Sequence, residues 1–295
     1  MPNLVEWFFD PARIGATSSA MPFAPSPPEA SCVSRPYDAP AFCGDSEASA
    51  GPVLLLGNFD GFHLGHAALL DAGRDAAGGR PVGVLSVEPH PRQFFAPAAA
   101  AFRIASAKVK RETFARRGFA FSCAPRFDAT FARQSPEAFV RDVLVRSVGV
   151  SQVVVGEDFR FGAGRAGTTE RLRAMGDELG FGVSVVATVR RQDARCSSSL
   201  IRHLLREGEA ATAGTLLGDP WTVEARLRRS LGGRVSVAWP DEILRPAPGR
   251  YNARLRRLAG GEALAECRLI ANGDGFRLDG AGAPEASDLA LDIVS

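Results

Sequence analysis

Residues 53–66 read Val-Leu-Leu-Leu-Gly-Asn-Phe-Asp-Gly-Phe-His-Leu-Gly-His, and this stretch decides the fold. It begins with an apolar run typical of a parallel strand that is covered on both faces. The glycines that follow allow the backbone to turn and to approach a ligand closely. Because a helix is expected from about His66, the order strand, turn, helix predicts a ligand site at the carboxyl end of an α/β sheet.

Short apolar runs alternate with helical segments along the chain that follows. We expect strands over 53–57, 82–87, 152–156 and 183–187, and helices from about 66 and over 108–117, 136–148, 168–179 and 198–206. This alternation predicts a doubly wound α/β fold with a parallel sheet over residues 52–218. After Pro220 the apolar residues recur with period two, which predicts a small antiparallel β domain over 219–295. Its alternate arginines are interpreted as a solvated strand face rather than a nucleic-acid site.

The composition excludes several classes of protein. With 295 residues, 45% hydrophobic, and a net charge of +2 from 35 basic and 33 acidic residues, the chain has no global field that would select nucleic acid or a membrane. Five cysteines without a C-x-x-C pair indicate reduced thiols. No apolar run is long enough to span a membrane and no signal peptide is evident, so a cytoplasmic location is expected.

Residues 1–51 are rich in Pro, Ser and Ala and are predicted to be a mostly disordered extension. Two alternatives stay open for this segment. The start codon is misassigned, or Trp7, Phe8 and Phe9 form a small docking patch.

The H-x-G-H element is the strongest chemical signal. His63 and His66 are three residues apart at the mouth of a helix, where both rings can point to the same side. Imidazoles there can donate hydrogen bonds to phosphoryl oxygens as charge develops in a transition state. Zinc binding by the pair is disfavoured because no third ligand stands at a recognisable spacing, so no metal ligand is assigned.

A second motif, Cys-Ser-Ser-Ser-Leu-Ile-Arg at 196–202, begins another helix. Helix capping alone explains one serine. Three serines followed by Arg202 also form a convergent anion site, suited to the polyphosphate of ATP. Both interpretations stay open for this motif on its own.

Three further loops have weaker signals. The segment Val-Gly-Glu-Asp-Phe-Arg-Phe-Gly at 155–162 leaves a strand and can hold a flat ring, and Glu-Pro-His-Pro-Arg at 88–92 presents two polar side chains on a stiff turn. Residues 162–167 satisfy G-x-G-x-x-G, which suggests a dinucleotide-binding dehydrogenase. That alternative is rejected because the strand ends too early and no ribose-binding carboxylate follows about 20 residues later.

Taken in order, these motifs resemble the bacterial bifunctional riboflavin kinase/FMN adenylyltransferase family, also called FAD synthetase. The resemblance runs from about Val53 to Pro220 and includes G-N-F-D-G-x-H-x-G-H at 57–66, P-H-P at 89–91, S-P-E-x-F-V at 135–140, V-G-E-D-F-R-F-G at 155–162 and S-S-x-x-I-R at 197–202. It implies a Rossmann-like H-x-G-H nucleotidylyltransferase that transfers AMP from MgATP to FMN without a covalent enzyme intermediate.

The resemblance also implies roles for residues of each motif. The catalytic group is His63, His66, Asp60 and Arg202; the ATP-binding group is Gly57, Asn58, Phe59, Gly65, Ser197, Ser198 and Ser199; the FMN-binding group is His90, Arg92, Asp158, Phe159 and Phe161. ATP with Mg²⁺ and FMN are the expected small-molecule partners.

The chain departs from the family in its last quarter. The P-T-A-N element of the kinase half is expected shortly after Arg234, but the sequence there reads Val-Ser-Val-Ala-Trp-Pro-Asp-Glu. Riboflavin kinase activity is therefore predicted to be absent. Ser199, Cys196 and Val87 are milder departures within the first part. Two alternative functions stay open, which are nucleotidyl transfer to another phosphorylated acceptor and an inactive flavin or nucleotide sensor.

Overall fold

The computed structural model describes residues 6–9, 51–97, 100–191, 194–273, 275–280 and 288–295. Their contacts group into two compact units that interleave along the chain. The first unit draws on 1–57, 72–94 and 117–185, and the second on 58–71, 95–116 and 186–295. The division predicted from sequence, with boundaries after residues 51 and 218, stays a prediction, and residues 1–5 and 10–50 of the expected disordered extension lie outside the described residues.

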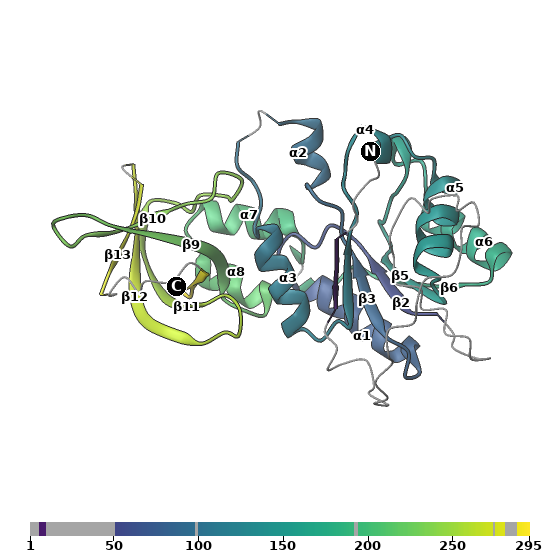
Figure 1. The fold of residues 1–295 in the computed structure, drawn as a ribbon, viewed down its shortest axis with the longest axis horizontal. Helices are drawn as coiled ribbons and strands as arrows, with labels where there is room; N and C mark the ends of the chain where they lie inside the picture. The colour runs from purple at the N-terminus through teal and green to yellow at the C-terminus, as the bar shows by residue number, and fades with distance from the viewer. Residues whose placement is uncertain (1–5, 10–50, 98–99, 192–193, 274, 281–287) are drawn as a thin grey trace, which may run out of the picture. The chain divides into compact units, whose positions relative to one another are not determined.

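The first unit is built on a six-stranded sheet in the spatial order β1-β4-β3-β2-β5-β6 (Figure 1). The strands are β1 (Glu6–Phe9), β2 (Val53–Leu56), β3 (Val82–Leu85), β4 (Phe121–Ala124), β5 (Gln152–Gly156) and β6 (Gly182–Val186). The five from β2 to β6 form the parallel sheet, and β1 pairs antiparallel with β4. Strand order reverses between β2 and β5, and ligands bind at such switch points in open α/β sheets.

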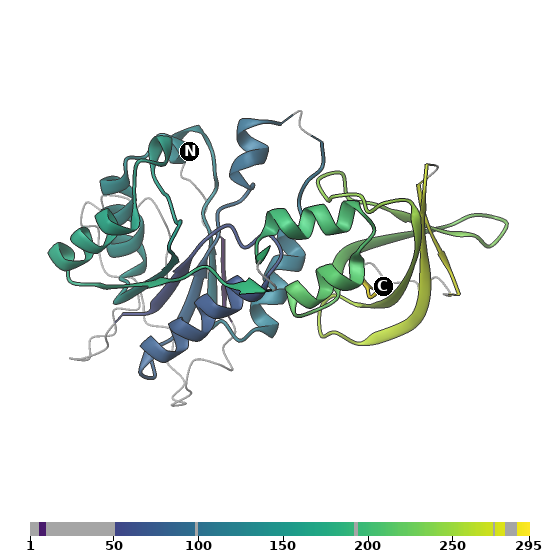
Figure 2. The same cartoon turned by 180° about the vertical axis from the view of Figure 1, so that it is seen from behind.

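Helices cover both faces of this sheet. Leu54 and Leu56 of β2 belong to a core that includes residues of the π-helix η2 (Phe139–Val148) and of α6 (Thr169–Leu179). Leu55 points to the other face, where it packs beside Gly73 of α1 (Leu64–Ala77). Figure 2 shows the helices from the reverse side. This alternation confirms the doubly wound parallel sheet, because a strand buried on both faces needs apolar residues at every position.

Most expected elements of the first unit are present. The helix expected over 136–148 begins as α5 (Pro136–Ala138) and continues as η2. Helices α2 (Pro91–Phe95) and α4 (Ala129–Ala132) are short additions. Strands β1 and β4 were not expected from the sequence. Residues 6–9, which belong to the segment predicted to be disordered, form β1 and pair with β4. The alternative that residues 7–9 form a docking patch stays a prediction.

The second unit contains a closed antiparallel barrel in the order β10-β13-β12-β11-β14-β9. Its strands are β9 (Trp221–Arg229), β10 (Val235–Ala238), β11 (Gly249–Arg257), β12 (Ala263–Asn272), β13 (Gly275–Asp279) and β14 (Leu289–Ile293). The antiparallel β domain expected after Pro220 is therefore confirmed. In β9 the side chains of Arg226 and Arg228 are exposed while Val223 and Ala225 are buried, as the period-two pattern indicated.

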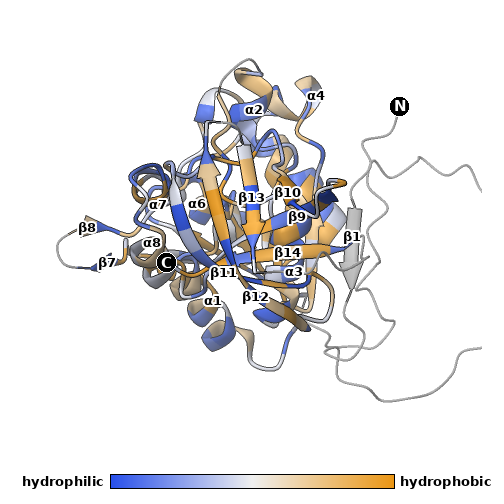
Figure 3. Cartoon of the chain, turned by 90° about the vertical axis from the view of Figure 1, so that its left-hand side faces the viewer, coloured by the Kyte–Doolittle hydropathy of each residue, from blue (hydrophilic) through white to orange (hydrophobic). Residues whose placement is uncertain are grey.

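The barrel shares one apolar core with two helices of the same unit, α7 (Ser198–Arg206) and α8 (Ala210–Leu217). In this core Trp221 meets Trp239 edge to face with 5.7 Å between ring centroids, and Trp239 stacks on Phe276 at 4.1 Å. Figure 3 shows the apolar colouring of β14, whose Leu289, Leu291 and Ile293 are buried in that core. The helix α3 (Ala107–Arg116) and the short hairpin of β7 (Arg190–Arg191) and β8 (Ala194–Arg195) complete the unit.

Among the described residues, no helix is long and apolar enough to cross a membrane.

Candidate active site

The loop between β2 and α1 has a backbone that depends on its glycines. Gly61 has φ +73°, and a Cβ there would lie 2.9 Å from the side chain of Ile104. Gly65 is the second residue of α1, and a Cβ there would lie 3.0 Å from the His63 ring. Phe59 also has positive φ, at 47°, which is a strained conformation for a bulky residue. Such strain is concentrated at functional sites, so the loop has the backbone of a binding element.

The two histidines of this loop stack face to face. Their ring centroids are 3.7 Å apart and the ring planes differ by 15°. Nδ1 of His66 lies 3.0 Å from the carbonyl oxygen of Gly61, so it must donate its proton. Nδ1 of His63 accepts the backbone N–H of His66 at 3.3 Å, so in neutral His63 the proton is on Nε2. The pair therefore contains two opposite tautomers.

Both imidazoles are uncharged at neutral pH. The pKa of His63 is lowered from 6.5 to about 4, mainly by burial and then by the charges of Arg195 and Arg202. Burial also lowers the pKa of His66 well below 6.5, followed by the effects of His63 and Lys110. Asp60 raises the pKa of His63, but its effect is smaller than that of either arginine, so the net field of charges at His63 is positive. A positive field around neutral donors suits an anionic ligand.

Asp60 is the node that joins the loop to two other segments. Its side chain is 1% exposed, and Oδ1 accepts the backbone N–H groups of Ile104 and Ala105 at 3.0 and 3.3 Å. Oδ2 accepts Nη2 of Arg202 at 2.6 Å. The catalytic role predicted for Asp60 stays a prediction, but a carboxylate engaged on both oxygens by the protein fits a positioning role better than direct contact with phosphate or Mg²⁺.

The start of α7 meets the histidine loop at this node. Ser198 Oγ donates to the backbone carbonyl of Asp60 at 2.7 Å, although the two residues are 138 positions apart. Arg202, one turn further along α7, also donates through Nε to the carbonyl of Phe102 at 2.8 Å and lies over the Phe102 ring. Two motifs predicted to share one ligand are thus brought together within the second unit.

The other residues predicted to bind ATP differ in their accessibility. Ser197 is the N-cap of α7 and accepts the N–H of Leu200 at 3.3 Å, which is the capping interpretation. Ser199 and Asn58 are exposed. Phe59, in contrast, is 1% exposed and packs against His66 with 4.7 Å between ring centroids. Its side chain packs behind the histidine and is buried, so the ATP-binding role predicted for Phe59 stays a prediction.

Two cations of the second unit were missed from the sequence. Lys110 of α3 is buried, and its Nζ donates to the carbonyl oxygen of Asn58 at 2.9 Å. Arg195 precedes the serine motif, and its charge acts on His63. Arg195 could have been identified from the sequence, because it directly precedes the serine motif. Lys110 belongs to no motif, and only the fold brings α3 to the loop.

The residues predicted to bind FMN lie in the first unit, in two loops. Phe161 is 6% exposed and packs between Phe139 and Phe159, with ring centroids 5.6 and 5.7 Å away, so it is mainly a core residue. Phe159 is half-buried and Asp158 is exposed. His90 accepts the N–H of Arg92 through Nδ1 at 3.1 Å, which orders the start of α2. The structure keeps Phe159, Asp158 and the His90–Arg92 turn as accessible groups.

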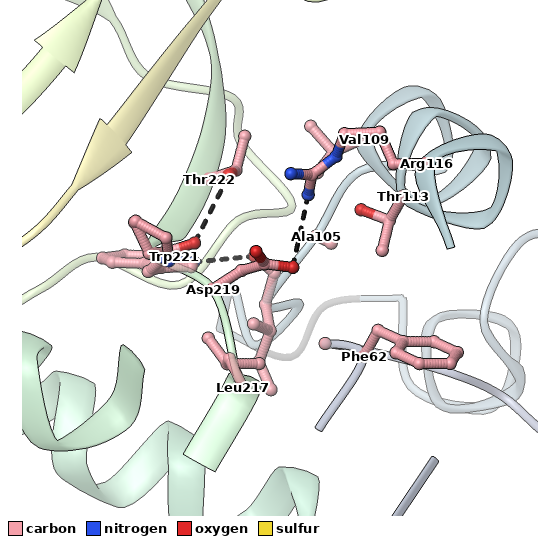
Figure 4. A pocket seen from close by; sticks show the side chains of 12 residues that line it. Phe62, Ala105, Val109, Thr113, Arg116, Leu217, Asp219, Trp221 and Thr222 are labelled. Carbon is pink, nitrogen blue, oxygen red and sulfur yellow. Dashed lines mark hydrogen bonds and ion pairs between the residues drawn. The ribbon is translucent and has the colours of Figure 1, made fainter. Parts of the chain in front are cut away.

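A small pocket of the second unit is lined in part by Gly61 and Phe62 of the loop (Figure 4). Its volume is about 40 Å³, and its wall includes Phe62, Trp221 and an ion pair of 3.4 Å between Arg116 and Asp219. None of the predicted polyphosphate groups lines it, and it is too small for a nucleotide. No group of three or more metal-ligating side chains occurs among the described residues.

Comparison of the chain with known proteins identifies its family. A model of the FAD synthetase family matches residues 45–200. The bifunctional riboflavin kinase/FMN adenylyltransferase of Escherichia coli strain K12 is 37% identical over 179 residues, which cover 60% of this chain and 57% of that protein. The protein of the same name from Haemophilus influenzae is 30% identical over 218 residues, or 71% of each chain.

A solved structure supports the fold. The crystal structure of a macrolide-efflux protein from Streptococcus pneumoniae superposes with a TM-score of 0.70 at 19% identity, covering 84% of this chain and 86% of that one. The match to the E. coli relative spans little more than half of that protein's length. Because the family match extends over more than half of the chain, this protein belongs to the FAD synthetase family.

Proposed function

We propose that this chain transfers AMP from MgATP to FMN, forming FAD and pyrophosphate. The observation that carries the proposal is the convergence at Asp60, where Ser198 and Arg202 of α7 bind the loop that holds His63 and His66. Hydroxyl, guanidinium and imidazole groups around one loop form a site for a polyphosphate. The family membership and the FMN adenylyltransferases among the relatives favour FMN as the acceptor.

In this reaction a phosphate oxygen of FMN attacks the α-phosphorus of ATP. The new P–O bond forms as the bond between the α-phosphorus and the bridging oxygen breaks, and pyrophosphate leaves with that electron pair. Positioning and charge neutralisation supply most of the rate in such transfers. Neutral His63 offers its Nε2–H to a phosphoryl oxygen, and the free N–H groups at the start of α7 add further donors.

His66 has a different part in the proposed mechanism. Its Nδ1–H is committed to the Gly61 carbonyl, so Nε2 has a lone pair in the neutral ring. A nearby polyphosphate favours the protonated form, and Nε2 then becomes a donor. The protein thus begins with one donating and one accepting imidazole and gains a second donor with its anionic substrate.

Mg²⁺ belongs to the substrate in this proposal. Both carboxylate oxygens of Asp60 are engaged by protein groups, so they do not form a ready metal site. Mg²⁺ often keeps several waters and binds through substrate phosphates. MgATP is therefore expected to enter with its metal already coordinated.

For FMN we propose the accessible groups of the first unit, Asp158, Phe159, His90 and Arg92, with Phe161 supporting Phe159 from the core. We also propose that riboflavin kinase activity is absent, because β10 (Val235–Ala238) and the residues after it stand where P-T-A-N is expected. A cytoplasmic location and the lack of nucleic-acid or membrane partners stay predictions.

A product assay tests this function. Purified protein with FMN, ATP and Mg²⁺ should give FAD and pyrophosphate in equal amounts, while riboflavin with ATP should give no FMN. His66→Ala should lower kcat on the order of 10²-fold with the fold intact. FMN that binds without FAD formation would indicate an inactive flavin sensor, and turnover with another phosphorylated acceptor would reassign the substrate.

A further inference from the structure

Lysine is rare in this chain. Of its 35 lysines and arginines, only Lys108 and Lys110 are lysines, and both lie in α3. A chain that uses arginine almost everywhere offers few compact ammonium groups. An ammonium is a point charge, whereas the planar guanidinium is larger and donates in a fixed fork, so the two do not fit the same buried position. The two lysines of α3 are therefore the chain's only ammonium side chains.

The two lysines face different surroundings. Lys108 is 38% exposed and pairs with Glu224 and Asp288 of the same unit. Lys110 is 4% exposed, and its Nζ donates to the backbone carbonyl of Asn58 at 2.9 Å. Burying an ammonium costs several kcal/mol unless it is well bonded. Such a cost beside the histidine loop suggests a purpose for the charge at that point.

The same face of α3 holds the loop at a second point. Phe114, one turn after Lys110, contacts the rings of Phe59 and Phe62, with centroids 5.8 and 6.4 Å away. Phe59 and Phe62 in turn contact His66, at 4.7 and 5.8 Å. Lys110 fixes the beginning of the loop and Phe114 fixes the aromatic residues behind the histidine. Residues four apart on a helix face one way, so a single turn of α3 contacts the loop at two points.

We propose that Lys110 is a positioning residue for nucleotidyl transfer: its ammonium fixes the carbonyl of Asn58 and so holds the loop in the shape that presents His63 and His66 to ATP.

An electrostatic effect accompanies this role. The groups that face His66 are the His63 ring, Lys110, the Gly61 carbonyl and the rings of Phe59 and Phe62. After burial and His63, the charge of Lys110 lowers the pKa of His66. Removal of that charge should raise the pKa of His66 toward 6.5. The imidazole thus reports on Lys110 without any need for turnover.

The test compares Lys110→Met with Lys108→Met, a change of the same residue type two positions away. Lys110→Met should lower kcat on the order of 10-fold to 10²-fold because the loop shifts, with a smaller change in KM for FMN. In NMR titrations, in which the His66 signal is assigned with His66→Ala, the pKa of His66 should rise in Lys110→Met. Lys108→Met should match the wild type in kcat and in the titration.

Two results would overturn the proposal. One is a folded Lys110→Met protein with wild-type kcat and an unchanged His66 titration, because Lys110 would then have only a structural part. If Lys110→Met does not fold, Lys110→Arg decides: it keeps the charge, and wild-type kcat in that variant would show that no specific ammonium position is needed. The activity arm rests on the proposed function, but the titration arm does not. A wild-type protein without FAD synthesis would therefore refute the function while the titration still tests Lys110.

Discussion

Two glycine-rich segments lie after strands in this molecule, and they differ in the polar groups that meet them. The loop of residues 57–66 leaves β2, contains Asp60 and two imidazoles, and is contacted by Arg202 and Lys110. The run of residues 162–167 follows β5, and its glycines answer steric needs. A Cβ at Gly162 would lie 2.7 Å from Pro136, and one at Gly167 would lie 2.7 Å from the Phe161 ring.

The difference shows that glycines in a loop can answer steric needs alone and do not by themselves define a ligand site. Gly61 and Gly65 make room for Ile104 and for the catalytic candidate His63. Gly167 makes room for a phenylalanine of the core. The convergent polar groups, which come from distant parts of the chain, distinguish the two loops.

The largest effect should follow from breaking the node of the first loop. Asp60→Asn leaves Arg202, whose side chain is 12% exposed, without its counter-charge, and loss of one partner of a buried pair costs about 3–5 kcal/mol. Asp158→Asn after β5 alters an exposed residue and should cost less than about 0.5 kcal/mol. Urea unfolding of both variants measures the two losses of stability. Equal losses would contradict the inference that Asp60 holds the loop to Arg202.

The pH dependence of stability should distinguish the loops next, since only the first contains histidine. The folded pKa of His63 is about 4, below its usual 6.5, so the unfolded chain takes up a proton first as the pH falls. Stability from this group is complete above pH 6.5 and should decline by roughly 3 kcal/mol by pH 4. Unfolding across this window should be less pH-dependent in His63→Gln. An identical slope in both proteins would contradict the buried neutral imidazole.

Alanine at a glycine of each loop should separate activity from stability. Gly65→Ala displaces the His63 ring and should lower kcat about 10-fold or more. Gly167→Ala crowds Phe161 and should cost about 1–3 kcal/mol of stability, with a smaller loss of kcat per folded molecule than Gly65→Ala. Steady-state kinetics and thermal unfolding measure the two effects. A loss of kcat in Gly167→Ala but not in Gly65→Ala would contradict the assignment of the active site to residues 57–66.

The smallest effects are expected at two helix caps. Ser197 caps α7 beside the first loop, and Thr168 caps α6 after the second. Each change to Ala should cost about 1 kcal/mol of stability. Only Ser197→Ala should also weaken ATP binding, because the start of α7 is part of the proposed site. Calorimetric titration with ATP checks this, and equal affinities in both variants would reduce Ser197 to a cap.

The sequence predicted the parallel sheet well because buried strands such as Val-Leu-Leu-Leu are continuous apolar runs. It missed β4, since Phe-Ser-Cys-Ala is too mixed to stand out, yet its first three residues are buried in the sheet. It missed β1, because pairing with β4 decides the conformation of residues 6–9. Local patterns do not include such long-range pairing.

The sequence named candidate site residues where one motif held several polar residues, but it could not name contacts that depend on tertiary structure. His63, His66 and Arg202 stood out by spacing. The burial of Phe59 behind His66, the engagement of both Asp60 oxygens and the contact of Lys110 with Asn58 depend on α3 and α7 meeting the loop. No spacing along the chain contains that information.

Calorimetric titration of MgATP into the wild type, His66→Ala, Arg202→Met and the double variant tests the central claim most directly. We expect one ATP per chain, weaker binding in each single variant, and a double variant whose loss differs from the sum of the two, as for groups that share one ligand. Unchanged ATP affinity in both single variants would show that the loop and the start of α7 do not hold a common triphosphate.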